Sequence, residues 1–159
     1  MNGVARQNGF SLVELLLVLL IIGIIAAIAI PSLLESRRIA NEATALANLK
    51  AIQTAEAAYS LTGTGTFGTF ANISGAGLLD SSWTGTPTRN GYQFVLTLGG
   101  GNAGFCARAN AISIGAGRRS FAVSHKNAIY QMDGQTAPAC DASTGAITGD
   151  ATLKVVGSN

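Results

Sequence analysis

The stretch NGFSLVELLLVLLIIGIIAAIAIP, residues 8–31, decides the fold of this 159-residue chain. Between Phe10 and Ile30 the only strongly polar residues are Ser11 and Glu14. A helix of this length rises about 31 Å, which is the thickness of the hydrocarbon core of a bilayer. A carboxylate in hydrocarbon costs on the order of 2.5–3.5 kcal/mol at mid-depth and less near the end of the span. Glu14 is therefore a candidate functional residue.

The apolar run is predicted to remain in the protein as a membrane helix. A cleaved secretory signal has an apolar stretch of about 7–15 residues followed by a cleavage site of small residues. This run is longer, and no such site separates it from a polar domain. Arg6 on one side and Arg37 and Arg38 on the other give only a weak charge bias. We expect a cytoplasmic N-terminus, because the polar remainder fits better outside the cytoplasm.

Residues 32–61 are predicted to continue the helix with one apolar face. Apolar residues recur there at spacings of three and four: Leu46, Leu49, Ile52, Ala55 and Tyr59. The charged residues are expected on the solvated or intersubunit side: Glu35, Arg38, Glu42, Lys50 and Glu56. The sequence GTGT at residues 63–66 ends the helix. The chain is therefore expected to begin with one helix of about 50 residues.

Residues 62–159 are predicted to form a small head in which a sheet covers the apolar face of the helix. Residues 62–90 are rich in Gly, Ser and Thr and are expected to be irregular. Alternation and turn signals predict four strands: YQFVLTL (92–98), FCARANAISI (105–114), SFAVS (120–124) and AIYQM (128–132). Asn127 tolerates the left-handed turn between the last two. The fold class is therefore α+β, with a long N-terminal helix packed on a four-stranded antiparallel sheet.

Charge and cysteine usage exclude several classes of protein. A net charge of +2 is too small to indicate a nucleic-acid-binding protein. Cys106 and Cys140 have no CxxC motif or histidine beside them, whereas a zinc site takes about four ligands. Behind an export-type N-terminus they favour one disulfide, and two independent buried thiols are the alternative. The disulfide would tie the loop-like segment after residue 134 to the second strand.

The segment GFSLVELLLVLLIIGIIAAIAIP resembles the N-terminus of type IV pilins and of the related type II secretion pseudopilins. These proteins carry a short polar leader, a glycine, an aromatic residue, a glutamate four residues later and a retained hydrophobic helix. The resemblance runs from Gly9 to Tyr59, about a third of the chain. It implies that Gly23 to Pro31 can lose helicity in the assembled fibre. A simple kink at Pro31 is the alternative.

The same resemblance implies processing by prepilin peptidase. The peptidase would cut between Gly9 and Phe10, remove residues 1–9 as a leader and methylate the new amine of Phe10. Glycine suits the cut because it lets the backbone take unusual conformations in a protease cleft. One feature departs from the family pattern. Its leaders commonly place Lys or Arg directly before the glycine, whereas here Arg6 is followed by Gln7 and Asn8.

The amine freed on Phe10 is the partner that we expect for Glu14. A neighbouring subunit, shifted along a filament, can bring its Phe10 amine against this carboxylate. In a low-dielectric bundle of helices the pairing offsets much of the desolvation of both groups. It would also set the axial register between subunits, as a buried polar residue does in coiled coils. The alternative is a plain anchor in which Glu14 sits at the membrane surface.

Enzymatic chemistry, metals and cofactors are not expected. The sequence has no GxSxG, HExxH or Walker motif. The single histidine, His125, falls in a hairpin turn and is expected to be solvated. The aspartates lack the spacing of an EF-hand loop: Asp80, Asp133, Asp141 and Asp150. Three basic residues could form a small DNA-binding patch or ordinary surface: Arg118, Arg119 and Lys126.

The sequence therefore predicts the major subunit of a type IV pilus, a homopolymer serving adhesion, motility or DNA uptake. Its other partners would be prepilin peptidase, an assembly platform and minor pilins. It would reside in the inner membrane as a prepilin and then in the extracellular pilus.

The first alternative is a type II secretion major pseudopilin in a periplasmic pseudopilus. LLDSSWTGTP at residues 78–87 faintly resembles a pseudopilin region but lacks its Asp-Pro junction, and a disulfide-closed loop favours a pilin. A bitopic membrane-anchored binding protein is more distant, because it has no use for Gly9, Phe10 and Glu14 at this spacing.

Overall fold

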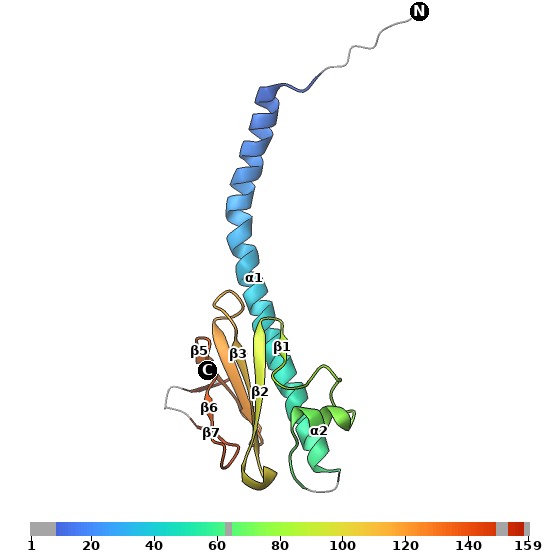
Figure 1. Cartoon of the computed structure of the whole chain (residues 1–159). Helices are drawn as coiled ribbons and strands as arrows, with labels where there is room; N and C mark the ends of the chain where they lie inside the picture. The colour runs from blue at the N-terminus through green and yellow to red at the C-terminus, as the bar shows by residue number, and fades with distance from the viewer. Residues whose placement is uncertain (1–8, 63–64, 149–152, 158–159) are drawn as a thin grey trace, which may run out of the picture. The chain divides into compact units, whose positions relative to one another are not determined.

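A computed structural model of the chain describes residues 9–62, 65–148 and 153–157 (Figure 1). The chain divides into two compact units, one ending at Ser36 and one beginning at Arg37. Of the predicted leader, only Gly9 belongs to the described residues. The described part of the first unit holds the beginning of a long helix, and the second, the head unit, holds the sheet.

Helix α1 runs from Leu12 to Ser60, so the predicted long helix is present. Gly23 and Pro31 both lie inside it. Proline has no N–H, so the carbonyl four residues earlier loses its helical donor, yet the helix continues beyond Pro31. Loss of helicity between Gly23 and Pro31 in a filament remains a prediction.

The head part of α1 buries the predicted apolar face. Ala45, Leu49, Ile52 and Ala55 are buried, and the flanking Leu46 and Tyr59 pack on the same core. The expectation for the charged residues was wrong at two positions, because Glu42 and Glu56 are also buried. Both lie on the buried face, where N–H groups of the head reach their carboxylates.

The main sheet has six antiparallel strands in the order β1-β2-β3-β4-β5-β8. Their bounds are β1 Thr88–Arg89, β2 Tyr92–Leu98, β3 Phe105–Ala111, β4 Arg119–Ser124, β5 Ile129–Asp133 and β8 Lys154–Val155. A second sheet pairs β6 (Ala139–Cys140) with β7 (Ile147–Thr148). The four longer strands are the predicted ones. The prediction of four strands in total was wrong, because a two-residue edge strand is too short to show alternation.

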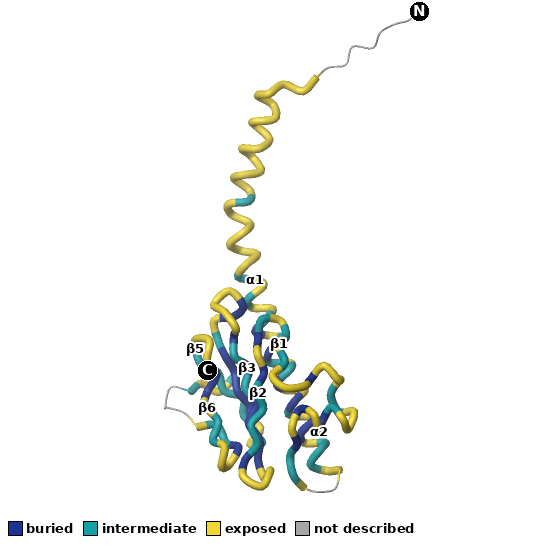
Figure 2. Tube along the Cα trace, viewed as in Figure 1, coloured by how far each residue is buried: buried dark blue, intermediate teal, exposed yellow. Residues whose placement is uncertain are grey.

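One face of the main sheet packs on α1 to form the core (Figure 2). Its buried side chains come from three neighbouring strands: Tyr92, Phe94, Phe105, Ala107, Ala109, Phe121 and Val123. Pairing residues share a face, and Phe94 pairs with Ala109, which pairs with Phe121. Large rings therefore alternate with alanines across the sheet, which lets the layers interdigitate.

The segment expected to be irregular contains helix α2 (Phe70–Gly75) as well as β1. Thr69 begins the helix with a reciprocal capping box, in which Thr69 Oγ1 accepts from the Asn72 N–H and Asn72 Oδ1 accepts from the Thr69 N–H. Phe70 and Ile73 on α2 are buried in the core. The prediction of irregular structure was wrong for this part of the segment, because its high content of Gly, Ser and Thr was taken to indicate a loop and the short capped helix was not recognised.

The segment after β5 covers part of the other face of the sheet. A disulfide joins Cys106 on β3 to Cys140 on β6, with a Cα–Cα distance of 5.9 Å, as the sequence predicts. The Ala137 N–H donates to Asn110 Oδ1 at 2.8 Å. Ala122 and Ser124, on this second face of β4, are also buried. The C-terminal segment is therefore fixed to the sheet covalently and by hydrogen bonds.

Candidate assembly site

Almost every residue in the helical segment of the first unit is exposed, as the colouring of Figure 2 shows. Every leucine, isoleucine and valine from Leu12 to Leu34 has an exposed fraction between 46% and 75%. A soluble monomer rarely exposes an apolar surface of this extent. The helix is also long and apolar enough to cross a membrane. These side chains therefore require lipid or other protein helices around them.

Glu14 lies in the first turn of this helix. Its carboxylate has no hydrogen bond or ion pair with any residue that the structure describes. The helix N-terminus carries partial positive charge and favours an acidic side chain, but this effect is worth only about 0.3–1 kcal/mol. A carboxylate in an apolar environment needs a stronger partner than that.

Phe10 stands before the first helical residue, Leu12, and is 84% exposed. Its backbone nitrogen is therefore not held against Glu14 by helical geometry. At Gly9 an added Cβ would meet nothing within 4 Å. The described residues therefore place no steric demand for glycine at this position.

A charged anchor, missed from the sequence, joins α1 to the start of β4. Glu42 Oε1 accepts from the backbone N–H groups of Arg118 and Arg119, at 2.9 and 3.2 Å. Glu42 Oε2 accepts from Nε and Nη2 of Arg119, at 2.8 and 2.6 Å. The carboxylate is buried, while the Arg119 side chain is 42% exposed. The positions 42, 45, 49, 52 and 56 follow helical spacing, and this signal could have placed both glutamates on the buried face.

Glu56 is the second buried glutamate on α1 and has no cationic partner. Its Oε2 accepts from the Gly68 N–H at 2.9 Å, whereas its Oε1 has no hydrogen bond. Burial raises the pKa of Glu56 to about 7, partly offset by the Gly68 N–H, which lowers it. A Cβ at Gly68 would lie 2.8 Å from the Tyr59 ring. A residue with a side chain would therefore clash there, and glycine allows the backbone N–H to reach Glu56.

The head offers no catalytic constellation in the part that the structure describes. No cluster of three His, Cys, Asp or Glu side chains there could hold a metal ion. Asp80 pairs with Arg89 at 3.0 Å, and Asp150 lies outside the described residues. His125 is half-buried with Nδ1 unpartnered and its ring 6.2 Å from that of Phe67, so the expectation of a solvated histidine was wrong.

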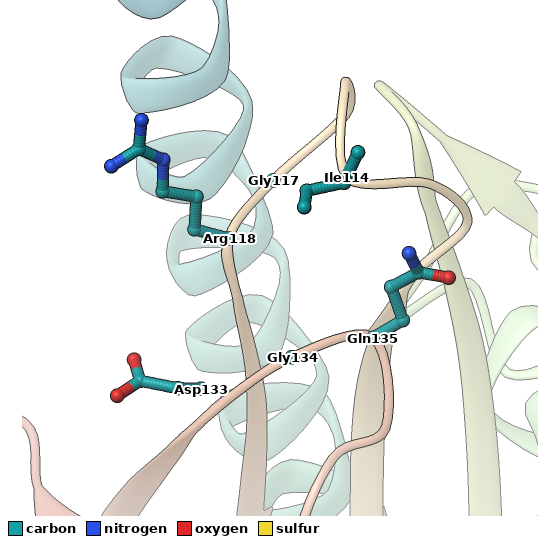
Figure 3. Close-up of a pocket in the computed structure, with 6 residues that line it drawn as sticks. All are labelled: Ile114, Gly117, Arg118, Asp133, Gly134 and Gln135. Carbon is teal, nitrogen blue, oxygen red and sulfur yellow. The ribbon is translucent and has the colours of Figure 1, made fainter.

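The expected basic patch is smaller in the structure than in the sequence. Glu42 neutralises Arg119. Lys126 is exposed on the turn between β4 and β5, away from that pair in the sequence. A hollow of about 420 Å³ lies between the β3–β4 connection and the segment after β5 (Figure 3). Arg118 and Asp133 point to one side of this hollow and Ile114 and Gln135 lie on the other. Side chains of opposite charge thus flank the hollow, so it is not a purely cationic surface.

Comparison with known proteins places the N-terminal segment in a recognised class. Residues 4–30 match the family model described as the prokaryotic N-terminal methylation motif. The chain is 44% identical over 54 residues to the type IV major pilin protein PilA of Myxococcus xanthus. That match covers 34% of this chain and 24% of the Myxococcus protein, so the chain spans about a quarter of the length of this relative.

A second relative is matched over most of its length. The chain is 37% identical over 82 residues to the type IV narrow pilus major component PilA5 of Thermus thermophilus. The match covers 50% of this chain and 71% of the Thermus protein. No solved structure matches the chain significantly.

Proposed function

The chain belongs to the type IV pilin family, and from this premise we propose that it is the major structural subunit of a type IV pilus. Its role is polymerisation rather than catalysis. Both relatives named above are major pilus components by name, which supports a pilin over the type II secretion pseudopilin.

The observation that carries the proposal is the unpaired Glu14 at the start of an exposed apolar helix. Lipid can cover the leucines and isoleucines of this helix, but it offers no fixed cation to Glu14. Cleavage after Gly9 would create one on Phe10, and a neighbouring subunit can deliver it. The pairing stabilises both charges in a low-dielectric bundle and fixes one axial offset between subunits.

Processing and location follow from the same premise. Prepilin peptidase would cut between Gly9 and Phe10 and methylate Phe10, since the fold itself places no demand on glycine there. The prepilin would wait in the inner membrane, anchored by residues 10–31. An assembly platform and minor pilins would then move it into a filament on the cell surface, where adhesion, motility or DNA uptake would follow.

The first experiment is to shear cells and measure the intact mass of the chain in the sheared and cell-bound fractions. A sheared species that begins at N-methylated Phe10 is the expected result. A processed species confined to the envelope would favour the pseudopilus instead. A chain that still carries residues 1–9 in every fraction would refute the assembly proposal.

A pair of variants then tests the role of Glu14. Glu14→Ala should abolish the sheared filament while the processed monomer still accumulates in the membrane. Glu35→Ala, an acid on the same helix beyond the apolar run, is the matched control and should retain filaments. A monomeric anchored protein would lose nothing in either variant, and equal filament yields would overturn the pairing.

A further inference from the structure

Arg108 is a half-buried cation on β3 without a partner in the described chain. It pairs across the sheet with Val95 and Ala122, so it stands on the face opposite α1. Its Nε is shielded from solvent and has no hydrogen-bond acceptor. Two other arginines of the head differ, since Arg89 pairs with Asp80 and Arg119 with Glu42. A partly desolvated charge without a counterion is unfavourable, so the site favours binding of an anion.

Arg108 lines a cavity of about 360 Å³, which falls within the range of about 300–1,000 Å³ for small-molecule sites. The other lining residues include three amides, one hydroxyl, the exposed side chain of Ile112 and the core residue Ala111, but no acid; the polar ones are Gln93, Asn110, Gln135 and Thr136. Asn110 uses its Oδ1 to accept from the Ala137 N–H, which leaves its NH₂ group as a donor toward a ligand.

We propose that this cavity binds an acidic saccharide, with the sugar carboxylate on Arg108 and the sugar hydroxyls on the surrounding amides. A guanidinium donates two parallel hydrogen bonds to a carboxylate. An amide both donates and accepts, which matches a hydroxyl group that does the same. Ile112, which is exposed, provides apolar surface for the C–H face of a sugar ring.

The lining favours this ligand over a nucleic acid. Nucleic-acid binding rests on several basic side chains that neutralise successive phosphates. This cavity has one cation, and the adjoining hollow that shares Gln135 is lined by both Arg118 and Asp133. A ligand with one negative charge and many hydroxyls therefore fits better than a polyphosphate.

The site extends beyond a single sugar unit. Gln135 lines both this cavity and the neighbouring hollow of Figure 3, which continues past Ile114 and Gly134. Two adjoining depressions that share one amide side chain suit a short linear oligosaccharide better than a monosaccharide.

The test uses the full chain, solubilised in mild detergent, and isothermal titration calorimetry at about 50 mM NaCl, where charge pairing is only weakly screened. The probes are trigalacturonate, a hyaluronan tetrasaccharide and sialyllactose, with neutral maltotriose and inorganic phosphate for comparison. At least one acidic probe should bind, and it should bind at least about tenfold more tightly than maltotriose or phosphate, because a charge-assisted pair adds to the hydroxyl contacts.

The variants separate the site from general electrostatics. Arg108→Gln should weaken the acidic probe by about tenfold or more, and Gln135→Ala by a few fold. Lys126→Gln removes the same charge from an exposed turn and should change the affinity by less than about twofold. Circular dichroism and thermal unfolding would verify that each variant is folded.

Several results would overturn the proposal. These are no binding of any acidic probe at millimolar concentration, phosphate bound as tightly as the sugar, or equal losses in Arg108→Gln and Lys126→Gln. Arg108-dependent binding of duplex DNA in place of sugar would overturn it as well. The measurement is made on the monomer, so its outcome is independent of whether the chain forms a filament.

Discussion

Glu56 offers the sharpest test of the energetics of the head. It lies outside the apolar run, fully buried on α1, with one hydrogen bond to the Gly68 N–H and no cation beside it. Burial raises its pKa from 4.5 to about 7. Between pH 4.5 and about pH 7, Glu56 is therefore protonated in the folded head and ionised in the unfolded chain. The free energy of unfolding should fall as pH rises through this window and should be flat above it.

The magnitude follows from the pKa difference. At about 1.36 kcal/mol per pKa unit, ionisation of Glu56 destabilises the head by about 3 kcal/mol at most above pH 7. Glu56→Gln keeps an oxygen for the Gly68 N–H and cannot ionise. The variant should therefore match the wild type near pH 4.5 and exceed its free energy of unfolding by up to about 3 kcal/mol at about pH 8.

The assay is urea unfolding of the detergent-solubilised chain, with its disulfide intact, followed by tryptophan fluorescence. Trp83, the single tryptophan, is buried between the rings of Phe70 and Phe94 at 5.5 and 5.2 Å, so its emission reports on the core. Glu35→Gln, which removes an acid on the same helix that lies outside the head unit, is the matched control. A Glu56→Gln effect that is the same at pH 5 and pH 8, or a loss of stability at pH 8, would refute the reasoning.

Three further changes test the other contacts of the head by the same fluorescence assay. Glu42→Ala should lower the free energy of unfolding by about 3 kcal/mol, because two backbone N–H groups lose their acceptor, although the exposed guanidinium can still be hydrated; a change below about 1 kcal/mol would contradict this. Replacing Cys106 and Cys140 together by Ser should cost about 4 kcal/mol, since the bond closes a loop with a sequence separation of 34; an unchanged urea midpoint would count against it. Gly104→Ala should cost about 1–3 kcal/mol, because the new Cβ would overlap the Thr144 carbonyl oxygen, and only a variant as stable as the wild type would disagree.

The sequence predicted the elements that carry a strong periodic signal. The long helix, its apolar face and the four longer strands were all visible as spacing, and the left-handed turn residue Asn127 has the expected positive φ of 67°. The two edge strands β1 and β8 were missed, because their pairing is decided by position beside a formed sheet. Helix α2 was missed for a related reason, since its Thr69–Asn72 capping box has Asn where the usual pattern has Glu or Gln.

The burial of Glu42 and Glu56 was not predicted, because their charge was given more weight than their positions on the helix. Charged side chains are rarely buried unless they are paired, so an exposed face was the natural assignment for Glu42 and Glu56. Their spacing from Leu49 and Ile52 placed them on the apolar face instead. The partners could not be found from the sequence, because Arg119 and Gly68 reach the helix only once the sheet and the connecting segment are folded.

Three glutamates on one helix thus show three ways of treating the same chemical group. Glu42 is buried against an arginine and two N–H groups, and it stabilises the head as an ion. Glu56 is buried with one N–H group, and burial raises its pKa because that group offsets only part of the desolvation. Glu14 has neither kind of partner among the described residues. It lies in the part of α1, residues 12–34, whose leucines, isoleucines and valines are all exposed. Because Glu42 has its cation within the head whereas Glu14 has none among the described residues, we propose that the cation for Glu14 comes from another chain and from the cleavage of that chain. The filament proposed here supplies both at once, since the amine that the cut creates on one subunit is the group that Glu14 of the next subunit lacks.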